Sequence, residues 1–269
     1  MPLRIVVTGS SSGIGASLKD ALLAAGHEVW GLARREQPPA ERFRATRCDV
    51  ADWAQVAAAA AAVEAAWGRL DGLVCCAGVQ GAVGPAMGLD PLKWSETVRV
   101  NLDGTYFPMR AFHGLLARTT QPRAKVLAFS GGGATGSRPN FSGYACAKTA
   151  IVRLVEVLQD ELKGQRFDVN AIAPGAIRTQ LTEEVVALGP QVVGEAEFAA
   201  ASKVLATGGG SLQKVYELVD FLLSSRSDGV GGRLFAAQWD PWRALPGREA
   251  EFTKSDTYLL RRVVPKEWS

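Results

Sequence analysis

Tyr144 and Lys148 are the residues of this sequence whose types and spacing best suit chemistry. They open an apolar-periodic run that continues to Leu162, which predicts a helix beginning near Tyr144. Residues four apart share a helix face, so we expect the phenol and the ammonium to lie side by side. A nearby cation favours the phenolate and lowers the pKa of a tyrosine, which suits a general acid/base. The pattern also occurs on ordinary surface helices, so its meaning depends on the elements that position it.

A glycine-rich loop lies near the N-terminus, between an apolar strand pattern at 3–8 and a helical pattern that stops at Gly26. A second apolar run follows at 28–33, which completes a strand–loop–helix–strand unit. Glycines let the backbone approach a diphosphate, and the amides at a helix N-terminus face its negative charge. We therefore expect a dinucleotide to contact the loop, through Gly9, Ser11, Ser12, Gly13, Ile14 and Gly15.

The remaining patterns continue this alternation of strands and helices. Strand patterns lie at 43–48, 70–76, 125–129, 168–173 and 233–237, and helical patterns lie at 52–67, 91–116, 144–162 and 212–225. Apolar strands alternating with helices predict a parallel sheet covered on both faces. We expect an α/β fold: one Rossmann-type, doubly wound, seven-stranded domain over 1–238. Residues 176–210 carry short helical patches broken by Gly and Pro, which indicates a lid.

Composition narrows the classes of protein that remain. The chain has 269 residues, 47% of them hydrophobic, and a formal charge of +3 without a basic stripe interleaved with aromatics. We therefore expect no nucleic-acid partner, no membrane span and no signal peptide. The cysteines have no metal-ligand spacing with the two histidines, so we expect no metal, reduced thiols and a cytoplasmic location (Cys48, Cys75, Cys76, Cys146, His27, His113).

With these motifs in order, the sequence resembles the short-chain dehydrogenase/reductase family, in its shorter branch, over about residues 3–238. The glycine loop resembles the family's cofactor loop. Asp49 and Val50 resemble its adenine contact, and Ala77 and Gly78 the end of its Asn-Asn-Ala-Gly motif. A last matching segment resembles the nicotinamide side of the family's site and consists of Pro174, Gly175, Ile177 and Thr179.

The resemblance implies an NAD(P)-dependent oxidoreductase that reduces a carbonyl or oxidises a secondary alcohol by hydride transfer. Tyr144 would be the acid/base, Lys148 would lower its pKa and hold the nicotinamide ribose, and Asn101 would keep a proton-relay water. The epimerase/dehydratase branch is disfavoured by the glycine spacing. A non-catalytic NADP-binding sensor or scaffold is disfavoured because Tyr144 and Lys148 are retained.

Arg34 and Arg35 follow the second strand pattern, where an acidic residue would bind the ribose hydroxyls of NAD. A guanidinium can pair with a 2′-phosphate and stack on adenine. We therefore expect NADP(H), with NAD(H) less favoured. The alternative is that both arginines only contact solvent.

We expect the partners to be a small carbonyl or alcohol substrate and further copies of the chain. Relatives pair the helices equivalent to 91–116 and 144–162 across a two-fold axis, which implies a homodimer or homotetramer. The C-terminal extension, 239–269, could wrap the core, cover the substrate mouth or contact a partner subunit. Because it could block a second interface, the dimer is slightly favoured. Arg138, Asn140 and Gln80 add polarity near the expected pocket without forming an evident anion site.

The sequence departs from the family at two places. Cys75-Cys76 stands where two asparagines are usual, which we interpret as small side chains filling a buried strand end, with other groups taking the backbone bonds. A redox role is the less favoured interpretation. The usual serine position, thirteen residues before Tyr144, is Gly131. We expect Ser130 to take this role through a bulge at the following glycines, with Ser142, a predicted helix cap, or no serine as alternatives.

Overall fold

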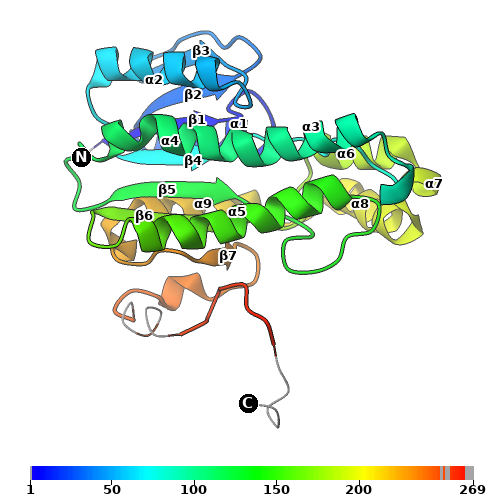
Figure 1. Ribbon diagram of the computed structural model, residues 1–269. Coiled ribbons are helices and arrows are strands. Elements are labelled where there is room, and N and C mark those ends of the chain that lie inside the picture. The colour runs from blue at the N-terminus through cyan, green and yellow to red at the C-terminus, as the bar shows by residue number, and fades with distance from the viewer. Residues whose placement is uncertain (1, 249–250, 252–254, 264–269) are drawn as a thin grey trace.

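A seven-stranded parallel sheet forms the centre of the protein, seen in the computed structural model of Figure 1. The structure describes residues 2–248, 251 and 255–263. The sheet order is β3-β2-β1-β4-β5-β6-β7. The strands are β1 (Arg4–Thr8), β2 (Glu28–Ala33), β3 (Phe43–Arg47), β4 (Gly72–Cys75), β5 (Ala124–Phe129), β6 (Phe167–Ala173) and β7 (Leu234–Ala236). The order reverses between β1 and β4, which places a crevice at the carboxyl ends of these strands. The expected Rossmann-type fold is confirmed.

Helices cover both faces of the sheet, because alternate strand residues feed two separate apolar cores. Along β1, Val6 packs with the helices of one face, and Ile5 and Val7 pack with those of the other. The first face carries α2 (Trp53–Trp67), α4 (Gly104–Leu116) and α5 (Ser142–Glu161), and the second carries α1 (Gly13–Ala24) and α9 (Leu212–Leu223). Strands buried on both sides explain why the strand patterns lack polar alternation.

The helix expected at 91–116 is interrupted. It divides into α3 (Pro91–Val98), a π-helical turn η2 (Arg99–Asp103) and α4. The Asn101 amide donates to the Thr97 carbonyl at 2.9 Å, and the Thr105 hydroxyl donates to the Asn101 carbonyl at 2.8 Å. Side chains that bond backbone carbonyls compete with the regular helical ladder, and π-turns of this kind concentrate at functional sites. Periodicity alone cannot reveal one inserted residue.

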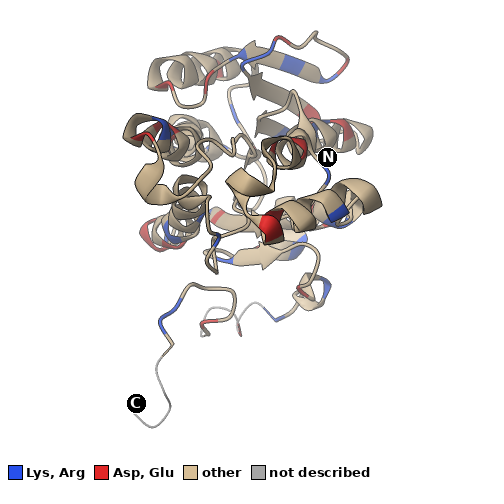
Figure 2. Ribbon diagram, turned by 90° about the vertical axis from the view of Figure 1, so that its right-hand side faces the viewer, with Lys and Arg blue, Asp and Glu red and all other residues tan. Residues whose placement is uncertain are grey.

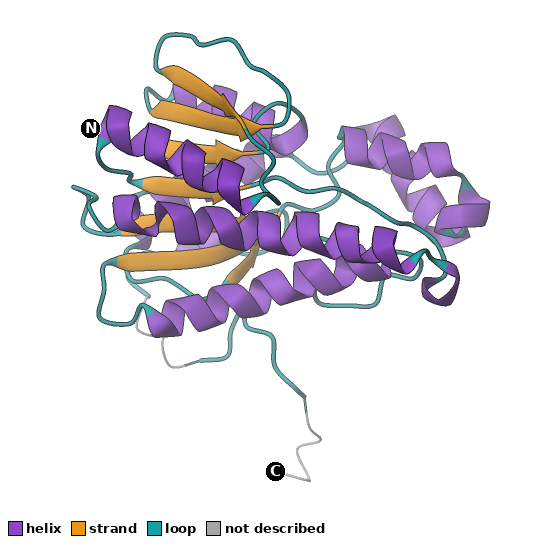
Figure 3. Ribbon diagram, turned by 45° about the horizontal axis from the view of Figure 1, so that its top comes forward, coloured by secondary structure: helices purple, strands orange, loops and turns teal. Residues whose placement is uncertain are grey.

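The expected lid is three short helices that project beyond the carboxyl ends of the strands (Figure 3). They are α6 (Gln180–Leu188), α7 (Pro190–Val193) and α8 (Glu195–Thr207). The two ends of the lid meet at its base, where Ile177 forms an isolated bridge with Gly209 and the Gly210 amide donates to the Ala176 carbonyl at 2.8 Å. The lid is therefore anchored at a narrow base next to the crevice.

The described part of the C-terminal extension packs on its own chain. Trp242 and Leu245 are buried in the core on the α9 face. The Leu234 amide of β7 donates to the Tyr258 carbonyl at 2.9 Å, and the Leu260 amide donates to the Glu156 carboxylate at 3.1 Å. The extension therefore covers the outer edge of β7. The remaining residues of the predicted extension, 249–250, 252–254 and 264–269, lie outside the described residues.

The charges are mixed at the edge of the molecule shown in Figure 2, where Lys and Arg are interspersed with Asp and Glu. Three further short helices complete the described elements: η1 (Ala86–Gly88), η3 (Ser225–Ser227) and η4 (Trp242–Ala244). Within the described ranges, no helix is both long and apolar enough to cross a bilayer. The same ranges contain no group of three or more side chains placed to hold a metal ion.

Candidate active site

Two adjoining cavities, of about 210 and 120 Å³, lie at the carboxyl ends of the strands. They share walls at Gly9, Ser12, Arg34 and the Ala77–Val79 segment. Most of the predicted site residues line one or both cavities: Gly9, Ser11, Ser12, Gly13, Ile14, Gly15, Arg34, Arg35, Asp49, Val50, Ala77, Gly78, Ser130, Tyr144, Lys148, Pro174 and Thr179. The topology thus brings segments from distant parts of the sequence to one crevice.

Three predicted residues do not line the cavities. Asn101 is fully buried behind the wall, and the Ile177 side chain is buried in the core of the α9 face. Gly175, at a φ of +85°, packs closely on the Gln238 side chain. For these three residues, the structure indicates support of the wall.

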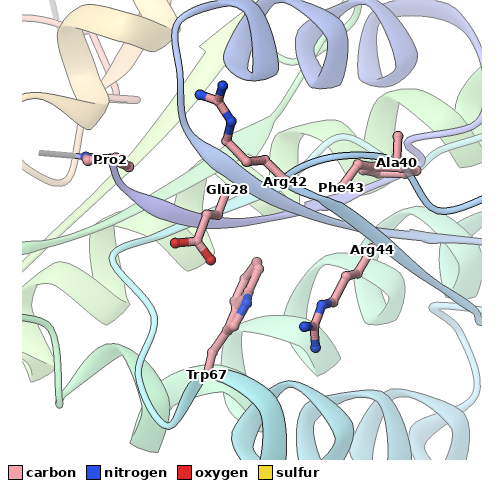
Figure 4. Close-up of a pocket in the computed structure, with 7 residues that line it drawn as sticks. All are labelled: Pro2, Glu28, Ala40, Arg42, Phe43, Arg44 and Trp67. Carbon is pink, nitrogen blue, oxygen red and sulfur yellow. The ribbon is translucent and has the colours of Figure 1, made fainter.

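A larger cavity, of about 370 Å³, lies at the opposite ends of the strands (Figure 4). The Glu28 carboxylate and the Trp67 indole are turned toward one another there, while Arg42 and Arg44 point away in different directions. None of the predicted site residues lines this cavity. It is therefore separate from the candidate active site.

The glycine loop has the backbone geometry that a diphosphate needs. Gly9 has a φ of +70°, and a Cβ there would lie 2.8 Å from the Ala77 Cα; a Cβ at Gly15 would lie 2.4 Å from the Gly9 carbonyl oxygen. Only glycine fits at both positions. Ser12, the N-cap of α1, makes no side-chain capping bond, so the first amides of α1 remain available to an anion. The loop therefore fits the diphosphate of a dinucleotide.

Thr8 supplies the backbone bonds that the missing asparagines would be expected to make. Its hydroxyl accepts from the Cys76 and Ala77 amides, at 3.1 Å each. Cys75 and Cys76 fill the end of β4, where burial raises the pKa of the Cys76 thiol to about 12. The Cys75 thiol is also held protonated by burial. This agrees with the structural interpretation of the pair and leaves little thiolate for redox chemistry.

Tyr144 and Lys148 lie side by side as their spacing predicts. The Lys148 ammonium is 5.5 Å from the centroid of the Tyr144 ring and donates to the Phe129 carbonyl at 2.9 Å. Both side chains are buried, and burial lowers the pKa of Lys148 to about 8. The ammonium is thus fixed between β5 and the phenol.

The pKa of Tyr144 is raised in this structure, although the sequence analysis expects Lys148 to lower it. Burial raises the pKa of the Tyr144 phenol above its ordinary value because a phenolate would lose its hydration. The cation that opposes this rise is Arg138, while Cys76 and Glu197 add to it. Side-chain spacing predicted the pair correctly, but it could not reveal how deeply the phenol is buried.

The expected role of Ser130 is not supported. Its hydroxyl donates to the Lys148 carbonyl at 2.9 Å, so its proton is committed to the backbone of α5. Gly131 is the residue that faces the phenol, because a Cβ there would lie 2.7 Å from the Tyr144 hydroxyl oxygen. Ser142 does not cap α5 as predicted, since Phe141 is the N-cap and the Ser142 hydroxyl accepts from the Trp94 indole at 3.0 Å. The geometry favours the alternative in which no serine takes this role.

Asn101 holds the wall of the crevice. Its amide donates to the Val79 carbonyl at 3.0 Å and accepts from the Val79 amide at 3.3 Å. A Cβ at Gly78 would meet both the Asn101 oxygen, at 2.8 Å, and the Lys148 ammonium, at 3.4 Å. Gly78 therefore lets the loop after β4 pass close to Lys148.

Several residues at or near the site were not predicted from the sequence. Gln180, Leu181 and Glu184 of the lid line the larger of the two cavities. Their position directly after Thr179, with a helical spacing of four, was the available signal. Glu197 does not line the cavities, but it pairs at 2.5 Å with Arg138, whose guanidinium packs on the Tyr144 ring. No sequence signal could show it, because the packing of α8 against the loop before α5 depends on the whole lid.

The sequence profile of the family described as "short chain dehydrogenase" matches residues 4–188. The chain belongs to the short-chain dehydrogenase/reductase family. It is an NAD(P)-dependent oxidoreductase that acts on CH–OH or C=O groups. A protein described as a short chain dehydrogenase of Monascus purpureus is 30% identical over 277 aligned residues, covering 97% of this chain and 88% of the relative.

Solved structures share the short-chain dehydrogenase fold. Aldohexose dehydrogenase of Thermoplasma acidophilum is 22% identical, with a TM-score of 0.78 over 89% of this chain and 96% of that one. A short chain dehydrogenase of Shigella flexneri, solved in complex with NADP, is 23% identical, with a TM-score of 0.71 over 88% of this chain and 97% of that one. At these identities the likeness concerns the fold.

The Thr8→Val substitution tests how the loop after β4 is held in this short-chain dehydrogenase. Valine matches threonine in shape but leaves the Cys76 and Ala77 amides without their acceptor. Unsatisfied buried groups cost about 1–3 kcal/mol each, so we expect the free energy of unfolding to fall by at least about 1 kcal/mol in urea titrations. Thr8→Ser keeps the hydroxyl and is the control. Equal stability of the valine and serine variants would contradict this assignment.

Proposed function

We propose that the chain is an NADP(H)-dependent reductase of a small carbonyl compound, or a dehydrogenase of the corresponding alcohol, with Tyr144 as its acid/base. The observation that carries this proposal is that Tyr144, Lys148 and the glycine loop line the same cavity. The cofactor, when bound, supplies or accepts the hydride. The protein would then have to bind the diphosphate, place the substrate oxygen and move one proton.

Each of these tasks has residues suited to it. The first turn of α1 would bind the diphosphate, and Pro174 and Thr179 would line the nicotinamide side of the site. The Tyr144 hydroxyl would donate its proton to the oxygen as negative charge develops there. Lys148, fixed by the Phe129 carbonyl, would hold the nicotinamide ribose and favour the phenolate that forms. Asn101 would position Val79 and the loop beside Lys148.

Arg34 and Arg35 support NADP(H) over NAD(H). Both side chains are exposed and line both cavities. The Arg35 guanidinium donates only one long bond, of 3.4 Å, to Gln180 of the lid. Two cations beside the end of β2 would attract a 2′-phosphate. The structure of the short chain dehydrogenase of Shigella flexneri contains NADP. The cofactor of that protein agrees with the preference proposed for this chain.

The alternative is an NADP-binding sensor or scaffold that no longer catalyses a reaction. It would bind the cofactor with the same loop and arginines, so cofactor binding alone cannot separate the two functions. Turnover that depends on Tyr144 would separate them. The retained acid/base pair favours the enzyme.

We further propose a homodimer formed through α4 and α5. Tyr106 and Val157 are 41% and 43% exposed on these helices, beside a groove of about 420 Å³ between them. The extension covers the outer edge of β7, which removes one surface that a tetramer would need. An isologous contact of the two helices therefore fits a dimer better than a tetramer.

We expect Tyr144→Phe to abolish turnover while leaving NADPH binding nearly unchanged. The hydroxyl delivers the proton, and general acid catalysis contributes about 10²–10⁴-fold. NADPH oxidation against a panel of ketones, quinones and keto sugars measures the first effect, and quenching of tryptophan fluorescence measures the second. If the variant keeps more than about a tenth of the activity, another group is the acid.

We expect Arg34→Ala to lower kcat/KM for NADPH at least about tenfold and to leave that for NADH nearly unchanged, since a charge-assisted bond to the phosphate contributes about 1.5–3 kcal/mol. Arg42→Ala, an exposed arginine in the cavity at the other end of the sheet, is the matched control. If Arg34→Ala leaves the ratio of kcat/KM for NADPH to that for NADH unchanged, both arginines only contact solvent.

We expect light scattering to give a dimer at micromolar concentration and Val157→Arg to give a monomer. An arginine in an apolar two-fold contact buries two unpaired charges. Met87→Arg, at a position that is 97% exposed on η1, is the control and should remain dimeric. A monomeric wild-type protein, or a dimeric Val157→Arg variant, would contradict the proposed contact.

A further inference from the structure

Gly131 stands where the family usually has a catalytic serine. A hydroxyl there would stabilise negative charge on the reacting oxygens, but this chain has glycine, and the neighbouring Ser130 proton bonds the Lys148 carbonyl. The proton transfer proposed above would be aided by a second group, besides Lys148, that favours the Tyr144 phenolate. The question is which side chain near the phenol carries a suitable charge.

Arg138 is the cation that packs on the Tyr144 ring. Its guanidinium carbon lies 5.3 Å from the centroid of that ring and 3.9 Å from the centroid of the Phe141 ring. The side chain is only 15% exposed. Gly133, after β5, makes room for it, since a Cβ there would lie 3.2 Å from the Arg138 Cβ. The same glycine run that removes the serine therefore admits the arginine.

Two neighbours hold the guanidinium in this place. Its Nε and Nη2 atoms donate to one Glu197 oxygen, at 3.1 and 2.5 Å, and Nη1 donates to the Gln80 side-chain oxygen at 3.3 Å. Glu197 belongs to α8, so the lid supplies the counter-ion of a cation that lies on the catalytic ring. A rigid, planar cation fixed at two edges keeps its charge in one position.

We propose that the Arg138 guanidinium stabilises the phenolate of Tyr144 in place of the missing hydroxyl, and that Glu197 of the lid weakens this effect. The inference rests on the proposed function, in which Tyr144 is the acid/base. Arg138 is thus a positioning residue that acts through Tyr144. Because Glu197 belongs to α8, the position of the lid would control how strongly the cation acts.

The charged and titratable groups around the phenol determine the direction of each effect. They are Lys148 on the same helix, Cys76 at the end of β4, Arg138 on the preceding loop and Glu197 on the lid, with Glu184 on the wall of the same cavity. A cation favours the phenolate, so removing Arg138 should raise the pKa of Tyr144. A carboxylate disfavours the phenolate, so neutralising Glu197 should lower that pKa.

These opposite signs separate the proposal from a purely structural role. Arg138→Met and Glu197→Gln break the same ion pair, so a lid latch would respond to both in the same direction. Only an electrostatic effect on Tyr144 shifts its pKa in opposite directions in the two variants. Arg138→Lys keeps the charge without the fixed planar geometry and should lie between Arg138→Met and the wild type.

The test is an NMR titration of full-length protein labelled with ¹³C at the tyrosine Cζ atoms. The chain has four tyrosines, and Tyr144→Phe assigns the signal. We expect Arg138→Met to raise the midpoint of Tyr144 by about one pH unit, or out of the accessible range, and Glu197→Gln to lower it. Arg118→Met is the matched control, because Arg118 follows α4 and forms an exposed pair with Glu64 of α2, and it should leave the midpoint unchanged.

Shifts of the same sign in both variants, or shifts no larger than in the control, would overturn the inference. The titration uses no substrate, so its result is independent of turnover. Opposite shifts in a protein that turns over no carbonyl would uphold Arg138 and refute the proposed function. Turnover that depends on Tyr144, with no shift in either variant, would uphold the proposed function and refute the role of Arg138.

Discussion

The contact between the ends of β1 and β4 is the constraint on which the site depends. At the point where the sheet order reverses, Thr8 accepts both amides that follow β4, and Gly9 passes within van der Waals distance of Ala77. Any side chain at Gly9 would separate these segments. Because the segments are held together, the first turn of α1 and the Ala77–Val79 loop form two walls of one crevice. The dinucleotide site follows from this packing of backbone on backbone.

Tyr144 and Lys148 are fixed by a second junction, between β5 and α5. The Lys148 ammonium donates to the Phe129 carbonyl, and the Ser130 hydroxyl donates to the Lys148 carbonyl. These reciprocal bonds fix the helix to the strand end and hold the phenol above Gly131. Ser130 therefore has a clear structural task, which explains its burial without a catalytic role. Outside α5, Arg138 is a cation whose charge opposes the rise that burial causes in the pKa of Tyr144.

Much of this arrangement could be predicted from the sequence. Apolar runs alternating with helical patterns define a parallel sheet, and a glycine loop between β1 and α1 has one common use. The spacing of Tyr144 and Lys148 fixes their shared face because helical geometry is regular. Features that depend on long-range packing could not be predicted. The π-turn at Asn101, the orientation of Ser130 at an irregular strand end and the arrival of Glu197 from the lid each depend on contacts between distant segments.

The central claim is that this crevice brings a nicotinamide cofactor and the Tyr144 phenol to one substrate carbon and oxygen. It is tested most directly by isotope transfer from NADPH carrying deuterium at both C4 positions of the nicotinamide, incubated with a mixture of ketones and keto sugars. The account predicts that the wild-type protein places deuterium on the carbinol carbon of a product. Tight binding of the labelled cofactor, with no deuterium in any product, would contradict it.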